Sequence, residues 1–135
     1  MVRKSGHSPA MDPDAASVAR ELRDREPVFH RPEHGTSRAN FEAMTVPDYW
    51  EVGASGRVYD RLVCLKELER RYADAAYDPL EGLQVSDFAV REAGADTWLA
   101  TYQLLQGERR TRRVSVWRRT IAGWVLVYHQ GTVIG

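Results

Sequence analysis

The hydrophobic pattern of the chain changes its period near the middle. Before Leu83, apolar residues recur at helical spacing, and from Leu83 onward they alternate with polar residues. A period of two is typical of half-buried strands, and Gly94, Gly107 and Gly123 interrupt it. The sequence therefore predicts four consecutive strands, over residues 83–92, 96–106, 110–120 and 124–134.

Three helices and one further strand are predicted before these four strands. Asp12 followed by Pro13 is an N-cap signal for a helix over residues 13–26. The Gly35-Thr36-Ser37 signal begins a second, short helix that reaches Met44, and Asp60 caps a third helix. The aromatic and β-branched stretch at residues 48–54 predicts a strand between the second and third helices.

The connections between the last four strands are too short to hold crossover helices. Consecutive strands should therefore pair as antiparallel hairpins. The expected architecture is α+β: three N-terminal helices packed on a strongly curved antiparallel sheet. We expect residues 12–135 to form this single domain, and residues 1–11, which lack periodic apolar positions, to form a flexible leader.

The register of the last hairpin decides which side chains share a face of the sheet. Arg113, Ser115 and Trp117 lie on one face of their strand. A three-residue loop at residues 121–123 places Ser115 opposite His129, whereas a loop one residue longer or shorter reverses the faces. We favour the first register.

The charge balance and the single cysteine exclude several classes of partner. Nineteen basic residues balance nineteen acidic ones, so no overall field draws the chain to nucleic acid or to an acidic membrane, and no apolar stretch approaches the length of a spanning helix. The six-residue stretch at 108–113 is basic but is expected to be a solvated hairpin tip. Cys64 has no partner for an internal disulfide, and no apolar secretory segment is present, so we expect a cytoplasmic location.

Several polar and aromatic side chains are candidates for a small-molecule pocket. Glu51 lies in an aromatic stretch, where a carboxylate is either a base or ligand anchor, or a structural group bonded to the turn at residues 53–56 or to Arg113. His129 is either an acid or base near neutral pH or a hydrogen-bonded structural residue. The full set of ligand-binding candidates is Glu51, Tyr59, Tyr102, Arg113, Ser115, Trp117 and His129.

We expect Glu51 and His129 to approach one another or to share Arg113 as a partner, because a carboxylate in an aromatic strand needs a cation or several donors. The four histidines show no zinc-type spacing with acids or cysteines. The sequence therefore predicts no metal site and no cofactor.

Three motifs carry a resemblance to a known superfamily. They are PDYWEVGASGRVYDR at 47–61, RRVSVWRR at 112–119 and GWVLVYHQGT at 123–132. With the order of predicted elements, they make the chain resemble the nuclear transport factor 2-like superfamily, and more closely a bacterial branch of it to which no reaction is assigned.

The resemblance implies a cone whose open end forms a pocket between sheet and helices, and a homodimer formed through the outer sheet face. The superfamily includes ketosteroid isomerases, polyketide cyclases, epoxide hydrolases, transport factors and oligomerising hubs, so the fold does not settle the function. The leading expectation is a domain that binds an unknown small molecule. The alternatives are an isomerase, cyclase or hydratase in which Glu51 or His129 moves a proton, and a homodimeric protein-interaction module.

Overall fold

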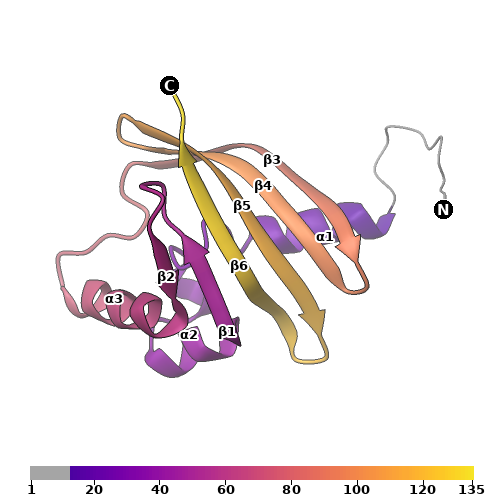
Figure 1. Ribbon diagram of the computed structural model, residues 1–135, viewed down its shortest axis with the longest axis horizontal. Helices are drawn as coiled ribbons and strands as arrows, with labels where there is room; N and C mark the ends of the chain where they lie inside the picture. The colour runs from indigo at the N-terminus through magenta and orange to yellow at the C-terminus, as the bar shows by residue number, and fades with distance from the viewer. Residues whose placement is uncertain (1–12) are drawn as a thin grey trace.

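The computed structural model describes residues 13–135, so the expected leader and the Asp12 cap lie outside the described residues. Three α-helices, one 3₁₀ helix and six strands make up this part of the chain (Figure 1). In chain order they are α1 (Pro13–Arg23), η1 (Pro32–His34), α2 (Arg38–Met44), β1 (Thr45–Val52), β2 (Val58–Asp60), α3 (Arg61–Ala73), β3 (Leu83–Gly94), β4 (Thr97–Gln106), β5 (Arg109–Thr120) and β6 (Gly123–Val133).

The six strands form one mixed sheet in the order β2-β1-β6-β5-β4-β3. Strands β3 to β6 form the antiparallel meander that the two-residue period predicts. The expectation of a wholly antiparallel sheet is wrong at one pairing, because β1 runs parallel to β6. The reason is connectivity: the whole meander separates β1 from β6, so no hairpin turn fixes their relative direction.

The element boundaries differ from the predicted ones mainly at prolines. Helix α1 ends at Arg23 instead of residue 26, because the residue before Pro27 is disfavoured in helical conformation. Strand β1 begins at Thr45 and ends at Val52, and Pro47, which has no N–H to give to the ladder, lies where its register with β6 shifts. The short strand β2 was not predicted.

One face of the meander carries the core. Helix α1 packs on it, while α2 and α3 pack against the β1–β2 end of the sheet (Figure 1). The core cluster joins buried α1 residues to alternate residues of β4, β5 and β6: Val18, Leu22, Trp98, Ala100, Trp117, Trp124 and Leu126. A second cluster between α2 and α3 consists of Phe41, Leu65 and Leu68, and Phe29 packs against both clusters. Phe29 thus lies between the meander core and α3.

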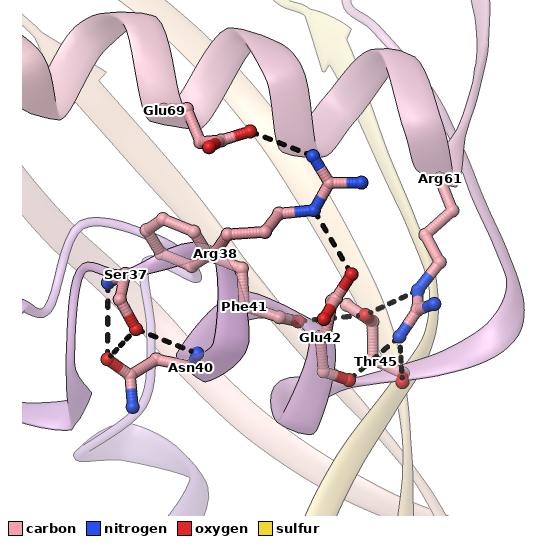
Figure 2. A network of polar contacts seen from close by, with 8 residues as sticks. All are labelled: Ser37, Arg38, Asn40, Phe41, Glu42, Thr45, Arg61 and Glu69. Atoms are coloured by element: carbon pink, nitrogen blue, oxygen red, sulfur yellow. Dashed lines mark hydrogen bonds and ion pairs between the residues drawn. The ribbon is translucent and has the colours of Figure 1, made fainter.

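A polar network fixes α3 to the end of α2 and the start of β1 (Figure 2). Arg38 donates to Glu42 at 3.2 Å and to Glu69 of α3 at 2.8 Å. Arg61, at the start of α3, donates to the Thr45 hydroxyl at 3.0 Å and to the backbone oxygens of Glu42 and Thr45. Exposed ion pairs contribute at most about 1 kcal/mol each, so this network serves to orient α3 more than to stabilise the fold.

The β5–β6 hairpin has the expected register at Ser115 and His129, but its turn length differs from the predicted one. Thr120 pairs with Gly123 across a two-residue turn, not a three-residue loop. The register then shifts between Val116 and Trp117, so that Val127 is an extra residue in β6 and Ser115 does lie opposite His129. The bulge is what turns His129 to the same face as Leu126.

The aromatic residues of the meander lie mostly on its covered face. Trp98, Tyr102, Trp117 and Trp124 are all buried there. On the opposite face Tyr128 contacts Trp50 of β1 in a tilted arrangement with ring centroids 4.5 Å apart, and Trp50 remains exposed.

Helix length and hydropathy rule out a membrane-crossing helix within residues 13–135.

Candidate functional site

A cleft opens between α3, the β1–β2 turn and the covered face of the meander. It has two parts, which we call the α3 lobe, of about 450 Å³, and the His129 lobe, of about 350 Å³. Both lobes are lined by Phe29, Glu51, Arg71, Arg109 and Arg113, so they are parts of one cleft. The α3 lobe adds apolar walls from Tyr59, Val63, Cys64 and Leu68, and the His129 lobe adds His30, Tyr77, Tyr102, Gln106 and His129.

Three arginines converge where the two lobes meet. Arg71, near the end of α3, is paired with Glu67 at 2.9 Å, and Arg109 is exposed at the start of β5. Arg113 lies deeper and is partly buried. The expectation of a solvated tip over residues 108–113 therefore fails for Thr111, which is fully buried, and for Arg113, which shares its inward face.

Arg113 is held by neutral groups. Its Nε donates to the Thr111 hydroxyl at 3.0 Å, and its Nη1 donates to the His129 ring at 3.3 Å. Gly131 leaves room for the guanidinium, because a Cβ there would lie 3.2 Å from the Arg113 Cζ. Within residues 13–135 no carboxylate forms an ion pair with Arg113. Burial lowers the pKa of this guanidinium, and the nearby Glu51 and Glu26 carboxylates offset that fall only in part, so a ligand anion would stabilise the charge further.

A chain of hydrogen bonds runs inward from Arg113. His129 Nδ1 lies 2.7 Å from the Ser115 hydroxyl, and the side chain of Ser115 in turn lowers the pKa of the Glu26 carboxyl. Burial, with the nearby charges of Arg113 and His30, lowers the pKa of His129 to about 3. His129 is therefore a neutral imidazole at ordinary pH and a poor general base in this state.

Glu26 is the centre of this network, although nothing in the sequence singled it out. It follows α1 and is fully buried. One carboxylate oxygen accepts from the Val28 N–H at 2.8 Å and from the Tyr102 hydroxyl at 2.7 Å, and the other accepts from Trp117 Nε1 at 2.9 Å. Burial raises the pKa of the Glu26 carboxyl, and the hydrogen bonds from Ser115, Tyr102, Trp117 and Val28 oppose that rise. A buried Trp and a buried Tyr signal that an acceptor is required, but not which residue supplies it.

The sequence candidates divide between the cleft wall and this buried network. Glu51, Tyr59, Tyr102, Arg113 and His129 line the cleft. Ser115 and Trp117 are buried behind the wall, where both contact Glu26. Asp87 is not a cleft residue: it is exposed at a bulge of β3 and accepts a hydrogen bond from Gln103.

Glu51 lies on β1 directly beside His129 of β6, since the two residues are register partners. Its carboxylate accepts a hydrogen bond from the Tyr49 hydroxyl at 2.6 Å, which is neither of the structural partners that the sequence suggested. Glu51 and His129 are therefore neighbours across the β1–β6 pairing, as expected. The partner of Arg113 is His129, not Glu51. The turn at residues 53–56 is a strand connection, closed by a Gly56 N–H to Gly53 oxygen bond at 2.8 Å.

Other chemistry at the cleft is limited. Burial, with the neighbouring Glu51 carboxylate, raises the pKa of the Cys64 thiol, so this side chain stays protonated and is not an activated nucleophile. In the part of the chain from 13 to 135, no group of three or more His, Cys, Asp or Glu is placed to hold a metal ion.

Comparison with known proteins identifies the fold, through solved structures alone. No protein-family model matches the chain, and no curated protein does. Solved structures do match. A DUF3225-family protein from Pectobacterium atrosepticum aligns with TM-score 0.63 at 16% identity, over 93% of this chain and 100% of that one. An NTF2-like protein from Rhodospirillum rubrum aligns with TM-score 0.60 at 23% identity, over 88% of this chain and 98% of that one.

The chain has the NTF2-like fold. A third similar structure is a proposed dehydratase of the NTF2-like family from Streptomyces avermitilis, with TM-score 0.64 and 18% identity, over 90% of this chain and 95% of that one. At these identities the NTF2-like likeness concerns the fold, and function has to be argued from the cleft itself.

Proposed function

We propose that this protein binds a small organic acid in the cleft, with the acidic group at Arg113. The observation that carries the proposal is the partly buried guanidinium of Arg113, which faces the cleft with neutral partners only. A desolvated cation of this kind is stabilised by a ligand anion. Arg109 and Arg71 line the same junction and add positive charge.

The rest of the cleft suggests the remainder of the ligand. The α3 lobe offers apolar contacts from Phe29, Val63 and Leu68. In the His129 lobe, the buried amide oxygen of Gln106 has no hydrogen-bond partner among residues 13–135. An acid with an apolar body and a hydrogen-bond donor, such as a hydroxy acid, matches these groups.

Removing the Arg113 charge is expected to weaken this binding strongly. Benzoate and mandelate should raise the melting temperature of the full chain, whereas the neutral isostere benzamide should not, because ligands stabilise the state they bind. In Arg113→Gln the affinity for the two acids should fall at least about tenfold, since a charge-assisted hydrogen bond is worth roughly 1.5–3 kcal/mol. Isothermal titration calorimetry measures both constants.

The matched control is Arg112→Gln. Arg112 is the exposed neighbour of Arg113, and its side chain points to the other face of β5. Its replacement changes the net charge equally but should leave acid binding intact. Equal losses in the two variants, or no binding of either acid to the wild-type protein, would refute the proposed function.

An enzyme of the isomerase, cyclase or hydratase type is the second candidate. The observation that favours it is a carboxylate, Glu51, that lines both lobes beside Arg113. In such an enzyme Glu51 would move the proton and Arg113 would stabilise developing negative charge. The buried, neutral His129 suits the role of base less well. The dehydratase assignment of the Streptomyces avermitilis protein is in keeping with this alternative.

A homodimer through the outer sheet face stays a prediction. Of the tryptophans in the meander, Trp98, Trp117 and Trp124 are buried on the covered face and are not available to a partner. On the outer face, the exposed Trp50 and its neighbour Tyr128 form an aromatic pair that a partner could cover. Sedimentation at micromolar concentration should give twice the chain mass, and Trp50→Lys should shift it to the monomer. A monomeric wild-type protein would end the dimer and interaction-module hypotheses together.

A further inference from the structure

We propose that Glu26, acting through Ser115 and His129, is a positioning residue for Arg113, and that an acid bound at Arg113 is taken up together with a proton. This inference rests on the proposed function, because it concerns the same cleft. It goes beyond it by assigning a role to buried groups that no ligand touches.

The donors and acceptors of the chain can be ordered without ambiguity. An arginine only donates, so His129 Nε2 must accept from Arg113. In a neutral imidazole the proton is then on Nδ1, which donates to the Ser115 hydroxyl oxygen 2.7 Å away. The Ser115 hydroxyl proton is then free for the Glu26 carboxylate, and a donor placed there accounts for the lowering effect of Ser115 on the Glu26 pKa.

Glu26 supplies the charge at the inner end of this chain. Its oxygens accept from the Val28 N–H, the Tyr102 hydroxyl and Trp117 Nε1, three donors that favour the ionised carboxylate. Its backbone is also fixed, because Arg31 Nε donates to the Glu26 carbonyl oxygen at 3.0 Å. The buried negative charge of Glu26 therefore faces the positive charge of Arg113 across two neutral bridging groups.

An acid that binds Arg113 competes for that positive charge. The anion draws Nη1 away from His129 Nε2 and leaves a buried lone pair and a less compensated Glu26 carboxylate. Both changes favour a proton on the His129–Ser115–Glu26 chain. A second negative charge nearby strengthens the effect, since the Glu51 residue lies beside His129.

The other titratable or charged side chains around His129 limit the effect but do not cancel it. Arg71 and Arg109 line the same lobe and oppose protonation, as does His30, whose Nδ1 donates to the Pro79 carbonyl oxygen at 2.8 Å. The full set comes from every element packed against the ring: Glu26, His30, Glu51, Arg71, Tyr77, Tyr102, Arg109 and Arg113.

Calorimetric titration of benzoate into the full chain tests the coupling. At about pH 6.5 benzoate is fully ionised, so the ligand itself supplies no titration. In two buffers of different ionisation enthalpy the apparent binding enthalpy should differ, and the sign of the difference should correspond to net uptake of protons on binding. Benzoate affinity should rise as the pH is lowered from about 8 to about 6.

Ser115→Ala cuts the chain between His129 and Glu26 while leaving Arg113 in place. Benzoate should still bind this variant, but proton uptake should fall to near zero, and ¹⁵N spectra should show that His129 no longer favours the Nδ1–H tautomer. Ser86→Ala is the control, because Ser86 is an exposed serine of β3. It should behave as the wild type.

The possible failures are distinguishable. Binding with a buffer-independent enthalpy overturns the coupling and leaves the proposed function standing. Full proton uptake in Ser115→Ala overturns the role of Glu26. No binding of benzoate or mandelate to the wild type overturns the proposed function and this inference with it. If Ser115→Ala does not fold, the ¹⁵N tautomer state of wild-type His129 decides: an Nε2–H tautomer in the free protein contradicts the ordered chain.

Discussion

Glu26→Ala is expected to lower the free energy of unfolding by about 3–5 kcal/mol, the range measured when one partner of a buried charged network is removed. The substitution leaves the Tyr102 hydroxyl, the Trp117 Nε1–H and the Val28 N–H without an acceptor in a fully buried site. It also creates a cavity beside the core. Chemical denaturation monitored by tryptophan fluorescence measures the loss.

Glu21→Ala is the matched control for this loss. Glu21, on α1, also accepts a hydrogen bond from a tryptophan, Trp124 Nε1, at 2.8 Å, but its side chain is exposed. Water can replace the carboxylate there, so the cost should stay below about 1 kcal/mol. Similar losses in the two variants would show that burial does not set the importance of Glu26.

The hydrophobic pattern predicted the meander well because alternation is a local property of each strand. The four predicted strands match β3, β4, β5 and β6 to within about two residues at each end. The Ser115–His129 register was also correct, yet the turn has two residues and the bulge at Val127 restores the register. A bulge leaves no clear mark in a sequence, so this agreement depended on two errors of opposite sign.

The residues that line the cleft could be predicted from the sequence, but the buried network behind them could not. His129 follows the apolar run of β6, and alternation along β5 puts Arg113 on the same face as Ser115 and Trp117; both Arg113 and His129 do line the cleft. Glu26 stands in a charged stretch before a proline and has the sequence signature of a solvated helix end. Only the packing of α1 on the meander brings it to Tyr102 and Trp117, which are 76 and 91 positions away.

The parallel pairing of β1 with β6 is a second feature that local patterns do not carry. Residues 48–54 indicated a strand, but a strand joined to its neighbour by no short turn has no readable direction. This pairing places Glu51 beside His129 and so brings acid and base candidates to one cleft. Long-range topology, rather than strand propensity, therefore sets the composition of the site.

The stability of the protein is expected to fall as the pH is lowered from about 6.5 to 5, and His129 should account for about 1.5 kcal/mol of that fall. The pKa of His129 is lowered to about 3, chiefly by burial, whereas a histidine in the unfolded chain titrates near 6.5. In this interval the His129 imidazole therefore binds a proton in the unfolded chain but not in the folded protein. Stability is fully present above the unfolded pKa and is lost toward the folded pKa.

His129→Gln isolates this contribution, because a glutamine can accept from Arg113 and donate to Ser115 without titrating. Urea unfolding of the two proteins at several pH values should show a wild-type slope steeper by up to about 1.4 kcal/mol per pH unit. The pH range of this comparison stays above 5 so that carboxyl groups do not contribute. The pKa of Glu67, for example, is lowered to about 2, chiefly by its hydrogen bond to Arg70, so its stabilising contribution is present above about 4.5 and is lost as the pH falls from there toward 2. Parallel pH profiles for wild type and His129→Gln would mean that the imidazole takes up a second proton in the folded protein as readily as in the unfolded chain. Arg113 could not then donate to its Nε2.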